Sequence, residues 1–220
     1  DLPNLFDMIS KGRDEIFTVH RLDRQTSGGL IFAKDRESHR TLSQAFMDRE
    51  PEKYYVAIVD GVPREREGII DAPLTESMSV RGKMLIHERG KESKTGYEVI
   101  EDFGNFSYLR LRLYTGRTHQ IRVHLAHIGH PIIVDTLYGK RDQFFLSEIK
   151  RKKFNLKKGH EERALLSRQP LHSQKLIIAH PVNGKPLTLE FEPPKDINAV
   201  LKQFRKILNK NGSNVQRVGE

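Results

Sequence analysis

Residues 109–131 read LRLRLYTGRTHQIRVHLAHIGHP, and this stretch carries two different periods of apolar residues. In its first five positions leucines alternate with arginines, as expected for a strand that is buried on one face. After a polar turn, apolar residues recur at helical spacing between positions 121 and 128, and Gly129 is a suitable helix stop. The stretch therefore predicts a half-buried strand followed by a short helix.

Similar patterns along the chain predict more strands than helices. Further strand candidates are Ile16–Val19, Gly29–Lys34, Tyr54–Val59, Thr95–Ile100, Lys175–Ala179 and Leu187–Phe191. Helical spacing occurs in Arg36–Glu50, His119–Ile128 and Asp196–Asn209. Many strands with scattered helices argue against a doubly wound parallel sheet. We therefore predict an α+β fold with a large, mixed, mostly antiparallel sheet flanked by helices.

Length and composition exclude several classes of protein. The 220 residues are 36% hydrophobic and 30% charged, which suits one folded domain with a substantial core. Cysteine is absent, which excludes a disulfide framework, a thiolate metal site and a cysteine nucleophile. No apolar run approaches the roughly 20 residues of a membrane span, and the polar start lacks the layout of a signal peptide. We expect a cytoplasmic protein with no membrane partner.

Positive charge is concentrated in one part of the chain. The net charge is +9, and between Lys140 and Lys175 eleven Lys or Arg face four acids. This segment has no clear apolar period and contains Gly159 and Pro170, so residues 140–170 are predicted to be a basic insertion. Such a density of like charge repels itself unless a polyanion lies against it. We expect contacts with a polyanion there, including Lys152 and Lys153, and the alternative is a merely solvated loop.

The first dense polar cluster is HRLDRQTSGG at residues 20–29, between two apolar strand candidates. Asp23 lies between Arg21 and Arg24, and nearby positive charge favours an ionised carboxylate. An ionised carboxylate suits a nucleophile or a base better than a proton donor. The alternative from local sequence alone is a loop salt bridge or a turn-capping aspartate.

The second cluster covers residues 115–131. Arg117 lies at the predicted helix N-terminus, where free N–H groups attract phosphate or carboxylate. Further hydrogen-bond donors near this helix N-terminus are Thr118, Gln120 and Arg122. A series of histidines suggests a metal site, namely His119, His124, His127 and His130. However, the cluster lacks an H-E-x-x-H pattern, so hydrogen-bonding or partly buried structural histidines are favoured and no metal is expected.

The third motif is KYYVA at residues 53–57. On a strand, Tyr54 and Tyr55 face opposite sides, so only one of them can point into a given cleft. Tyrosine offers a stacking surface for a base and a polar tip, although core packing is the alternative. P-loops and dinucleotide fingerprints are absent, so no nucleotide cofactor is expected.

HRLDRQTSGGLIFAK, KYYVA and TGRTHQIRVHLAHIGHPI, in this order and spacing, resemble the RluA-type family of RNA pseudouridine synthases. Leu171-His172-Ser173 and the later His180-Pro181 extend the resemblance over nearly the whole chain. The resemblance implies the pseudouridine synthase catalytic fold and the isomerisation of uridine in structured RNA, ribosomal or transfer. It implies no cofactor and no metal, and we expect a monomer.

The resemblance also assigns roles to residues. Asp23 matches the essential aspartate, Arg117 matches the arginine that ion-pairs with it, and Tyr55 matches the tyrosine that stacks on the target uracil. Arg21 matches an arginine that enters the stack vacated by the flipped base, and Leu171 matches an apolar wall of the pocket. The expected substrate-binding residues are therefore His20, Arg21, Thr118, Gln120, Arg122, Leu171, Lys152 and Lys153.

The chain departs from the family pattern in several places. No Lys-Pro-x-Gly motif precedes His20, so residues 1–210 are expected to be a catalytic domain without its N-terminal part or an upstream S4-type domain, followed by a polar tail at 211–220. Val134 replaces an expected glycine and Ser173 an expected alanine, which changes turns or packing more readily than chemistry. The rival functions are a catalytically silent RNA-binding module and a histidine-dependent metallohydrolase.

Overall fold

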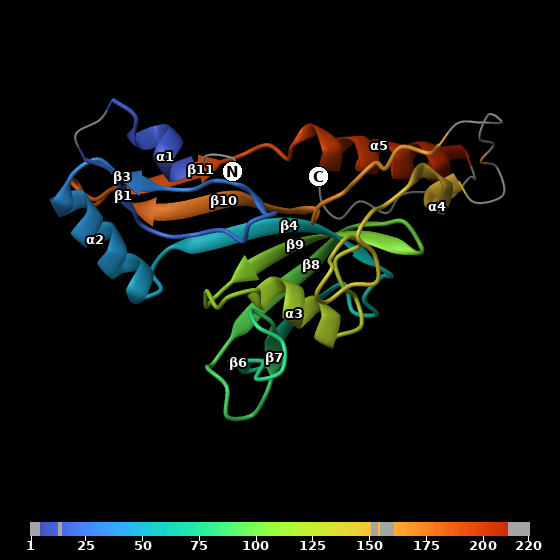
Figure 1. Ribbon diagram of the computed structural model, residues 1–220, viewed down its shortest axis with the longest axis horizontal. Helices are drawn as coiled ribbons and strands as arrows, with labels where there is room; N and C mark the ends of the chain where they lie inside the picture. Colours follow the sequence, from blue (N-terminus) through green and yellow to red (C-terminus); the bar gives the residue numbers. More distant parts are fainter. Residues whose placement is uncertain (1–4, 13–14, 151–153, 155–160, 211–220) are drawn as a thin grey trace.

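The computed structural model describes residues 5–12, 15–150, 154 and 161–210. Within this part of the chain the centre is a seven-stranded sheet, in which strands follow the order β11-β10-β4-β9-β8-β5 and β2 pairs with β10 (Figure 1). Its members are β2 (Ser27–Gly28), β4 (Glu52–Asp60), β5 (Glu67–Asp71), β8 (Lys94–Asp102), β9 (Phe106–Leu113), β10 (Leu171–Ala179) and β11 (Pro186–Glu190).

The sheet is mixed but mostly antiparallel. Only β2 runs parallel to its described neighbour, with Ser27 opposite His172 on β10, and the other pairs of this sheet are antiparallel. Two small antiparallel sheets are separate, β1 (Phe17–Thr18) with β3 (Phe32–Ala33) and β6 (Leu74–Glu76) with β7 (Met84–Ile86). The predicted α+β class with a mostly antiparallel mixed sheet is confirmed.

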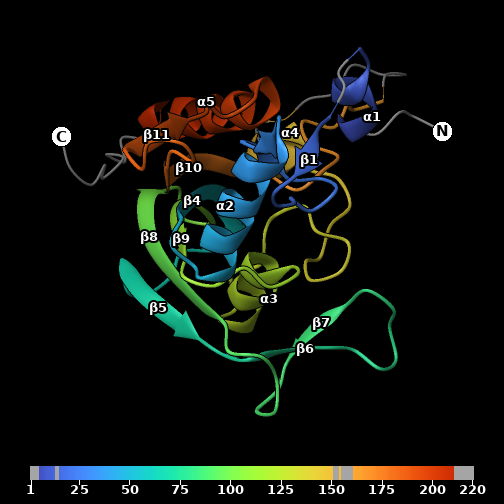
Figure 2. The ribbon, with the colours of Figure 1, turned by 90° about the vertical axis from the view of Figure 1, so that its left-hand side faces the viewer.

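Helices lie on both faces of the sheet (Figure 2). On one face, α3 (Gln120–His127) packs against the β4 residues Tyr55, Ala57 and Val59. On the other face, α5 (Lys195–Lys210) covers Val56 and Ile58. The core therefore has two layers separated by the sheet, because successive side chains of a strand point to opposite faces. The remaining helices are α1 (Leu5–Ser10), α2 (Arg36–Met47) and α4 (Leu146–Lys150).

Helix α2 has clear local start and stop signals. The side chain of Asp35 accepts a hydrogen bond from the N–H of Ser38 at 2.7 Å, which caps the first turn. The helix ends at Met47 rather than at the predicted Glu50. The reason is that Arg49 takes a left-handed conformation with φ 62°, which ends the helix before Pro51.

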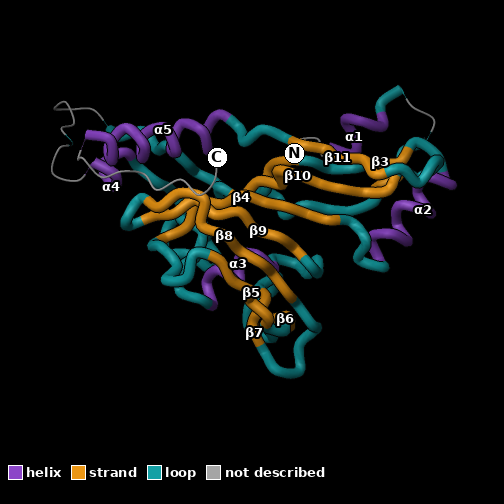
Figure 3. Tube along the Cα trace, turned by 180° about the vertical axis from the view of Figure 1, so that it is seen from behind, coloured by secondary structure: helices purple, strands orange, loops and turns teal. Residues whose placement is uncertain are grey.

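Several short elements differ from the sequence prediction. Of the predicted strand Gly29–Lys34, only the two residues of β3 form a strand. This segment pairs with β1 instead of joining the main sheet. Strand β5 and the β6–β7 hairpin were not predicted, and the hairpin projects from the sheet (Figure 3). The apolar pattern did not predict strand β5, because this strand lies at the sheet edge and buries little besides Ile70.

The predicted basic insertion is anchored in the core at both of its described ends. Phe144 and Leu166 form an antiparallel bridge and are buried beside α5. Arg141 pairs with Asp60 and Glu148, so its charge is compensated within the protein. The expected RNA-contact residues Lys152 and Lys153, and the expected tail at 211–220, lie outside the described residues. Among the described residues, no helix has the length and apolar character needed to cross a bilayer.

Gly28 is the point at which the polar loop 20–26 joins the main sheet. Its φ of +119° is a backbone conformation that side chains rarely adopt, and a Cβ there would lie 2.2 Å from the carbonyl oxygen of Ser173. Both the conformation and the close approach to β10 therefore require glycine.

We expect Gly28→Ala to lower the free energy of unfolding by about 3 kcal/mol or more, since backbone strain and a backbone clash add. The melting temperature should fall by roughly 6–12 °C. The matched control is Gly82→Ala, where φ is +75° but nothing lies within 4 Å of the added Cβ, and we expect a cost of about 1 kcal/mol. Equal melting temperatures of the two variants would show that the contact with Ser173 does not constrain the loop.

Candidate active site

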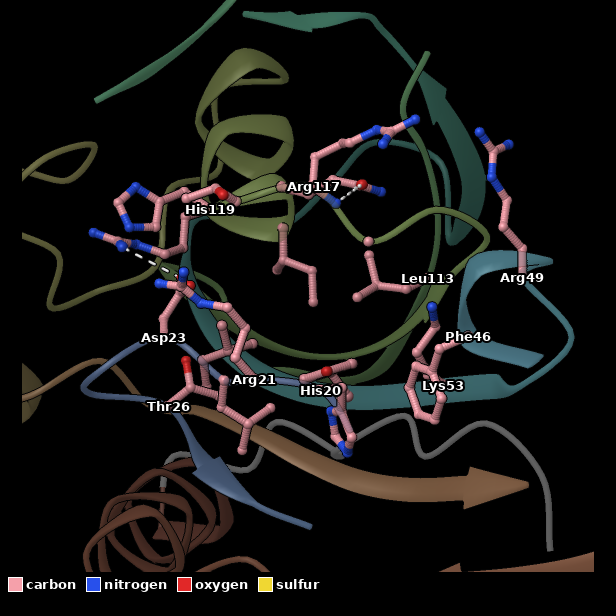
Figure 4. A pocket seen from close by; sticks show the side chains of 18 of the residues that line it. His20, Arg21, Asp23, Thr26, Phe46, Arg49, Lys53, Leu113, Arg117 and His119 are labelled. Carbon is pink, nitrogen blue, oxygen red and sulfur yellow. Dashed lines mark hydrogen bonds and ion pairs between the residues drawn. The ribbon is translucent and has the colours of Figure 1, made fainter. Parts of the chain in front are cut away.

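A cavity of about 770 Å³ lies between α2 and the start of α3, on the sheet face that carries Tyr55 (Figure 4). Its walls come from segments far apart in the sequence: the loop after β1, the end of α2, β4, the turn before α3 and the start of β10. All the predicted site residues among the described ones border it: His20, Arg21, Asp23, Tyr55, Arg117, Thr118, Gln120, Arg122 and Leu171.

Asp23 is held in a tight turn at the cavity. The N–H of Thr26 donates to the carbonyl oxygen of Asp23 at 2.9 Å, and the chain then enters β2 at Ser27. The Asp23 side chain is only 20% exposed. The first polar cluster therefore folds as a turn fixed to the sheet, with its carboxylate partly removed from solvent.

The cation that pairs with Asp23 is Arg122, so the prediction of an Arg117 ion pair is wrong. Arg122 Nη1 lies 3.4 Å from Asp23 Oδ2, and the Arg122 side chain is 4% exposed. Arg117 instead donates from Nε to the carbonyl oxygen of Glu92 at 3.2 Å. Figure 4 shows Arg117 pointing away from Asp23.

The turn before α3 explains this difference. The Gln120 Oε1 atom accepts hydrogen bonds from the hydroxyl of Thr115 and the N–H of Arg117, which folds the chain back at the helix start. Arg117 is thereby left on the rim, and the first turn of the helix carries Arg122 onto its buried face. The prediction that Gln120 donates to the substrate is also corrected, because its amide nitrogen donates to Lys94 O and Thr95 Oγ1 rather than to the cavity.

Arg122 is fixed by a second carboxylate. Its Nε and Nη2 atoms donate to Asp135 at 2.7 and 2.9 Å, and Asp135 is 1% exposed. With its amide in the orientation that satisfies its neighbours, the Gln169 oxygen also accepts from this guanidinium. Burial alone would lower the pKa of Arg122, but the hydrogen bonds to Asp135 and the charges of both aspartates raise it. A permanent cation is therefore locked behind Asp23.

Tyr55, not Tyr54, faces the cavity, as predicted. Tyr55 is 8% exposed, and its burial raises the pKa of its hydroxyl to about 12; a hydrogen bond with Ser173 opposes this rise and the charge of Asp23 adds to it. The phenol is thus protonated at neutral pH and close enough to Asp23 to feel its charge. Tyr54 points to the other side, where its hydroxyl donates to Glu52. Ser173, expected to change turns or packing more readily than chemistry, hydrogen-bonds the Tyr55 hydroxyl.

His20 and Leu171 form walls of the cavity. The His20 ring stacks on Phe46 with centroids 4.7 Å apart, and its Nε2 accepts from the N–H of Ile31. Burial, together with the charge of Lys53, lowers the pKa of His20 to about 4, so this ring is neutral. Leu171 is 3% exposed and borders the cavity as the predicted apolar wall.

Three cations on the cavity have no carboxylate within ion-pair distance in the described part of the chain: Arg21, Lys53 and Arg117. Lys53 lies two residues before Tyr55, so both side chains are on the same face of β4. Burial and the charge of Arg49 lower the pKa of Lys53. The exposed Thr118 adds a hydroxyl at the same rim. An anion would find uncompensated positive charge there.

The histidine series does not converge. His124 is buried and hydrogen-bonds Thr95 and the carbonyl oxygen of Ala72, whereas His130 bonds the carbonyl oxygen of Asp60. His119 contacts Tyr138. Among the residues that the structure describes, no three His, Asp or Glu side chains are arranged to hold a metal ion. These contacts match the favoured interpretation of hydrogen-bonding, structural histidines.

Sequence reasoning assigned no role to three residues that shape the site, Lys53, Asp135 and Tyr138, and it considered His119 only as a structural histidine or a metal ligand. The spacing Lys-x-Tyr on a strand was a usable signal for Lys53, because positions two apart share a face. Asp135 gave no such signal, since its contact with Arg122 depends on how the segment after α3 folds back. Val134, in place of an expected glycine, is buried in the core beside α5.

The chain has clear relatives among known proteins. The sequence profile of the family described as RNA pseudouridylate synthase matches residues 6–127. An uncharacterized RNA pseudouridine synthase of Chlorobaculum parvum is 40% identical over 199 residues, which cover 89% of this chain and 60% of the relative. A ribosomal large subunit pseudouridine synthase D of Zymomonas mobilis is 38% identical over 88% of this chain and 57% of the relative. The chain thus spans about 60% of the length of these relatives.

The fold also has a solved counterpart. The structure of human RNA Pseudouridylate Synthase Domain Containing 4 superposes with a TM-score of 0.68 at 25% sequence identity, covering 86% of this chain and 76% of the human one. The likeness confirms the pseudouridine synthase catalytic fold. From the profile match, the relatives and the shared fold, we conclude that the chain belongs to the RNA pseudouridylate synthase family, among its RluA-type members.

Proposed function

We propose that this chain isomerises a uridine in structured RNA to pseudouridine and that Asp23 is the reacting carboxylate. The N1–C1′ bond breaks, the uracil turns, and a C5–C1′ bond forms. C5 loses its hydrogen as a proton and N1 takes up a proton, so the product is an isomer of uridine. The observation that carries this proposal is the placement of Asp23, paired with the buried Arg122, in the same cavity as Tyr55.

Arg122 serves Asp23 in two ways. A cation beside a partly buried carboxylate favours the charged form, which is the form that can act on the nucleoside. The Asp135 carboxylate fixes the guanidinium, so Asp23 is aimed as well as charged.

Tyr55 is the proposed stacking partner of the target uracil. Its ring faces the cavity beside Leu171, and its hydroxyl is protonated at neutral pH. A base that enters this part of the cavity would be held between aromatic and apolar surfaces. The hydroxyl is also available to move a proton during the reaction, provided that Asp23 or the nucleoside approaches it.

The uncompensated cations support an RNA substrate. Extruding a base from its stack costs a few kcal/mol, which contacts with the phosphate backbone must offset. Arg21, Lys53 and Arg117 stand on the cavity with no carboxylate partner in the described part of the chain, and phosphate oxygens would supply the missing negative charge. In contrast, Arg141 and Arg168 pair with carboxylates.

Large-subunit ribosomal RNA is the proposed substrate. The name of the Zymomonas mobilis relative refers to the ribosomal large subunit, and that relative covers most of this chain. Transfer RNA is the second candidate, because a cationic cavity reads phosphates without distinguishing the two classes.

The rival functions fit the site less well. A silent RNA-binding module would need the cations but not a carboxylate held by a buried arginine. A metallohydrolase would need histidines that converge, whereas His124 and His130 have separate partners.

The function is tested by the release of hydrogen from uracil C5 in large-subunit ribosomal RNA and, in parallel, in transfer RNA. We expect the wild type to release it from ribosomal RNA and Asp23→Asn to release none, because the amide keeps the shape but not the charge. RNA affinity of Asp23→Asn should stay within about threefold of the wild type, since phosphates dominate binding. An active Asp23→Asn variant would disprove the assignment.

The cationic rim predicts a change in salt dependence. Lys53→Gln combined with Arg117→Gln should weaken RNA binding and flatten the log–log plot of affinity against salt by about 0.7 for each phosphate that is no longer neutralised. The matched control is Lys202→Gln with Lys206→Gln, two exposed lysines on α5 that remove the same charge elsewhere. If both pairs of substitutions change the slope equally, only net charge matters and the rim does not bind RNA.

A further inference from the structure

Asp135 organises a turn as well as an ion pair. Its Oδ1 atom accepts hydrogen bonds from the N–H groups of Leu137 and Tyr138, at 3.0 and 3.1 Å, while the same carboxylate holds Arg122. The turn brings the Tyr138 ring under the guanidinium of Arg122, whose Cζ lies 4.9 Å from the ring centroid. The position of Tyr138 is therefore tied to that of Arg122.

The hydroxyl of Tyr138 lies between two hydrogen-bonding partners. The N–H of Met84 on β7 donates to it at 2.7 Å, and His119 Nδ1 lies 2.9 Å away. A phenol oxygen that already accepts one hydrogen bond can still donate its single proton. In the described part of the chain, His119 Nδ1 is the only acceptor that this proton can reach. Burial raises the pKa of Tyr138, so the proton stays in place.

The direction of this hydrogen bond sets the tautomer of His119. If Nδ1 accepts from Tyr138, the neutral imidazole carries its proton on Nε2. Burial and the charge of Arg122 lower the pKa of His119, while the carboxylates of Asp23 and Asp135 oppose the shift and Arg21 adds to it. The lowered pKa favours the neutral ring, and donation from Tyr138 would leave the ring proton on Nε2.

His119 is held at the cavity by an unusual backbone. It precedes α3 with φ 55°, in the left-handed region, and makes no side-chain cap to the helix. Strained residues of this kind concentrate at functional sites. Figure 4 shows His119 on the same side of the cavity as Asp23. Within the described residues, its Nε2–H group has no protein acceptor.

We propose that His119 donates a hydrogen bond from Nε2–H to a carbonyl oxygen of the target uracil, and that Tyr138 is the positioning residue that fixes this donor. The proposal rests on the proposed function, because it assigns one contact of that substrate. A carbonyl suits a neutral donor, whereas the phosphates are better matched by the three uncompensated cations on the rim. As the uracil leaves C1′, its carbonyl oxygens gain negative charge, so the contact strengthens during the reaction.

The first test needs no RNA. Histidine labelled with ¹⁵N should show the Nε2–H tautomer at His119 in the wild type, with the resonance assigned by its disappearance in His119→Asn. Tyr138→Phe keeps the ring under Arg122 but removes the hydroxyl. We expect it to raise the pKa of His119, since it deletes a hydrogen bond that stabilises the neutral ring. An Nδ1–H tautomer in the wild type, or an unchanged pKa in Tyr138→Phe, would overturn the proposal.

The second test uses RNA with 2-thiouridine or 4-thiouridine at the target, because sulfur accepts hydrogen bonds poorly. The wild type should turn over one of these substrates about tenfold more slowly than uridine, and His119→Asn should lack that difference. Asparagine tolerates the left-handed backbone but cannot reach the place of Nε2. If His119→Asn keeps the full discrimination, or the wild type has none, the contact does not exist. Failure of the wild type to modify uridine itself would instead reject the proposed function, while the tautomer test still stands.

Discussion

The site depends on a single guanidinium placed between two carboxylates. Arg122 is almost completely buried, and a buried charge is costly unless it is paired and hydrogen-bonded. Asp135 takes two of its donors and Asp23 a third, so the arginine is tolerated where an uncompensated one would not be. The same interactions link the segment after α3 to the loop before β2, which are remote in sequence. Removing the arginine would leave two carboxylates facing each other with no cation between them.

Ion pairs with carboxylates distinguish the structural cations of this chain from the cations that are available to a ligand. Arg141, Arg168 and Arg205 each lie against carboxylates and stabilise the packing of α4, α5 and the sheet. Arg21 and Lys53 border the cavity and have no such partners among the described residues. Net charge alone pointed to a polyanion but could not place it. Within the cavity, the cations without a carboxylate partner in the described part of the chain lie on the same walls as Asp23 and Tyr55.

The sequence predicted the elements with strong periods and missed the contacts that depend on tertiary folding. Strands β4 and β9 and the helices α3 and α5 were recognised because they bury continuous apolar faces, and α2 was recognised from the spacing of Leu42 and Phe46, which pack in a separate cluster. The side that Tyr55 faces followed from strand alternation. The ion pair was assigned to Arg117 because the motif contains two arginines and nothing local distinguishes them. The hydrogen bonds of Gln120 to Lys94 and Thr95, and of Arg122 to Asp135, do distinguish them, and these bonds connect segments that only the fold brings together.

The most direct measurement compares two matched substitutions, Arg122→Lys and Arg117→Lys, by the rate of C5 hydrogen release at saturating RNA. Lysine keeps the charge but cannot hold two carboxylates in a fixed fork. The account predicts that Arg122→Lys loses about 100-fold or more in kcat, because Asp23 is no longer aimed. Arg117→Lys should keep kcat within about threefold, because a point charge still serves a phosphate contact. A large loss of kcat in Arg117→Lys together with a nearly normal Arg122→Lys would contradict the account.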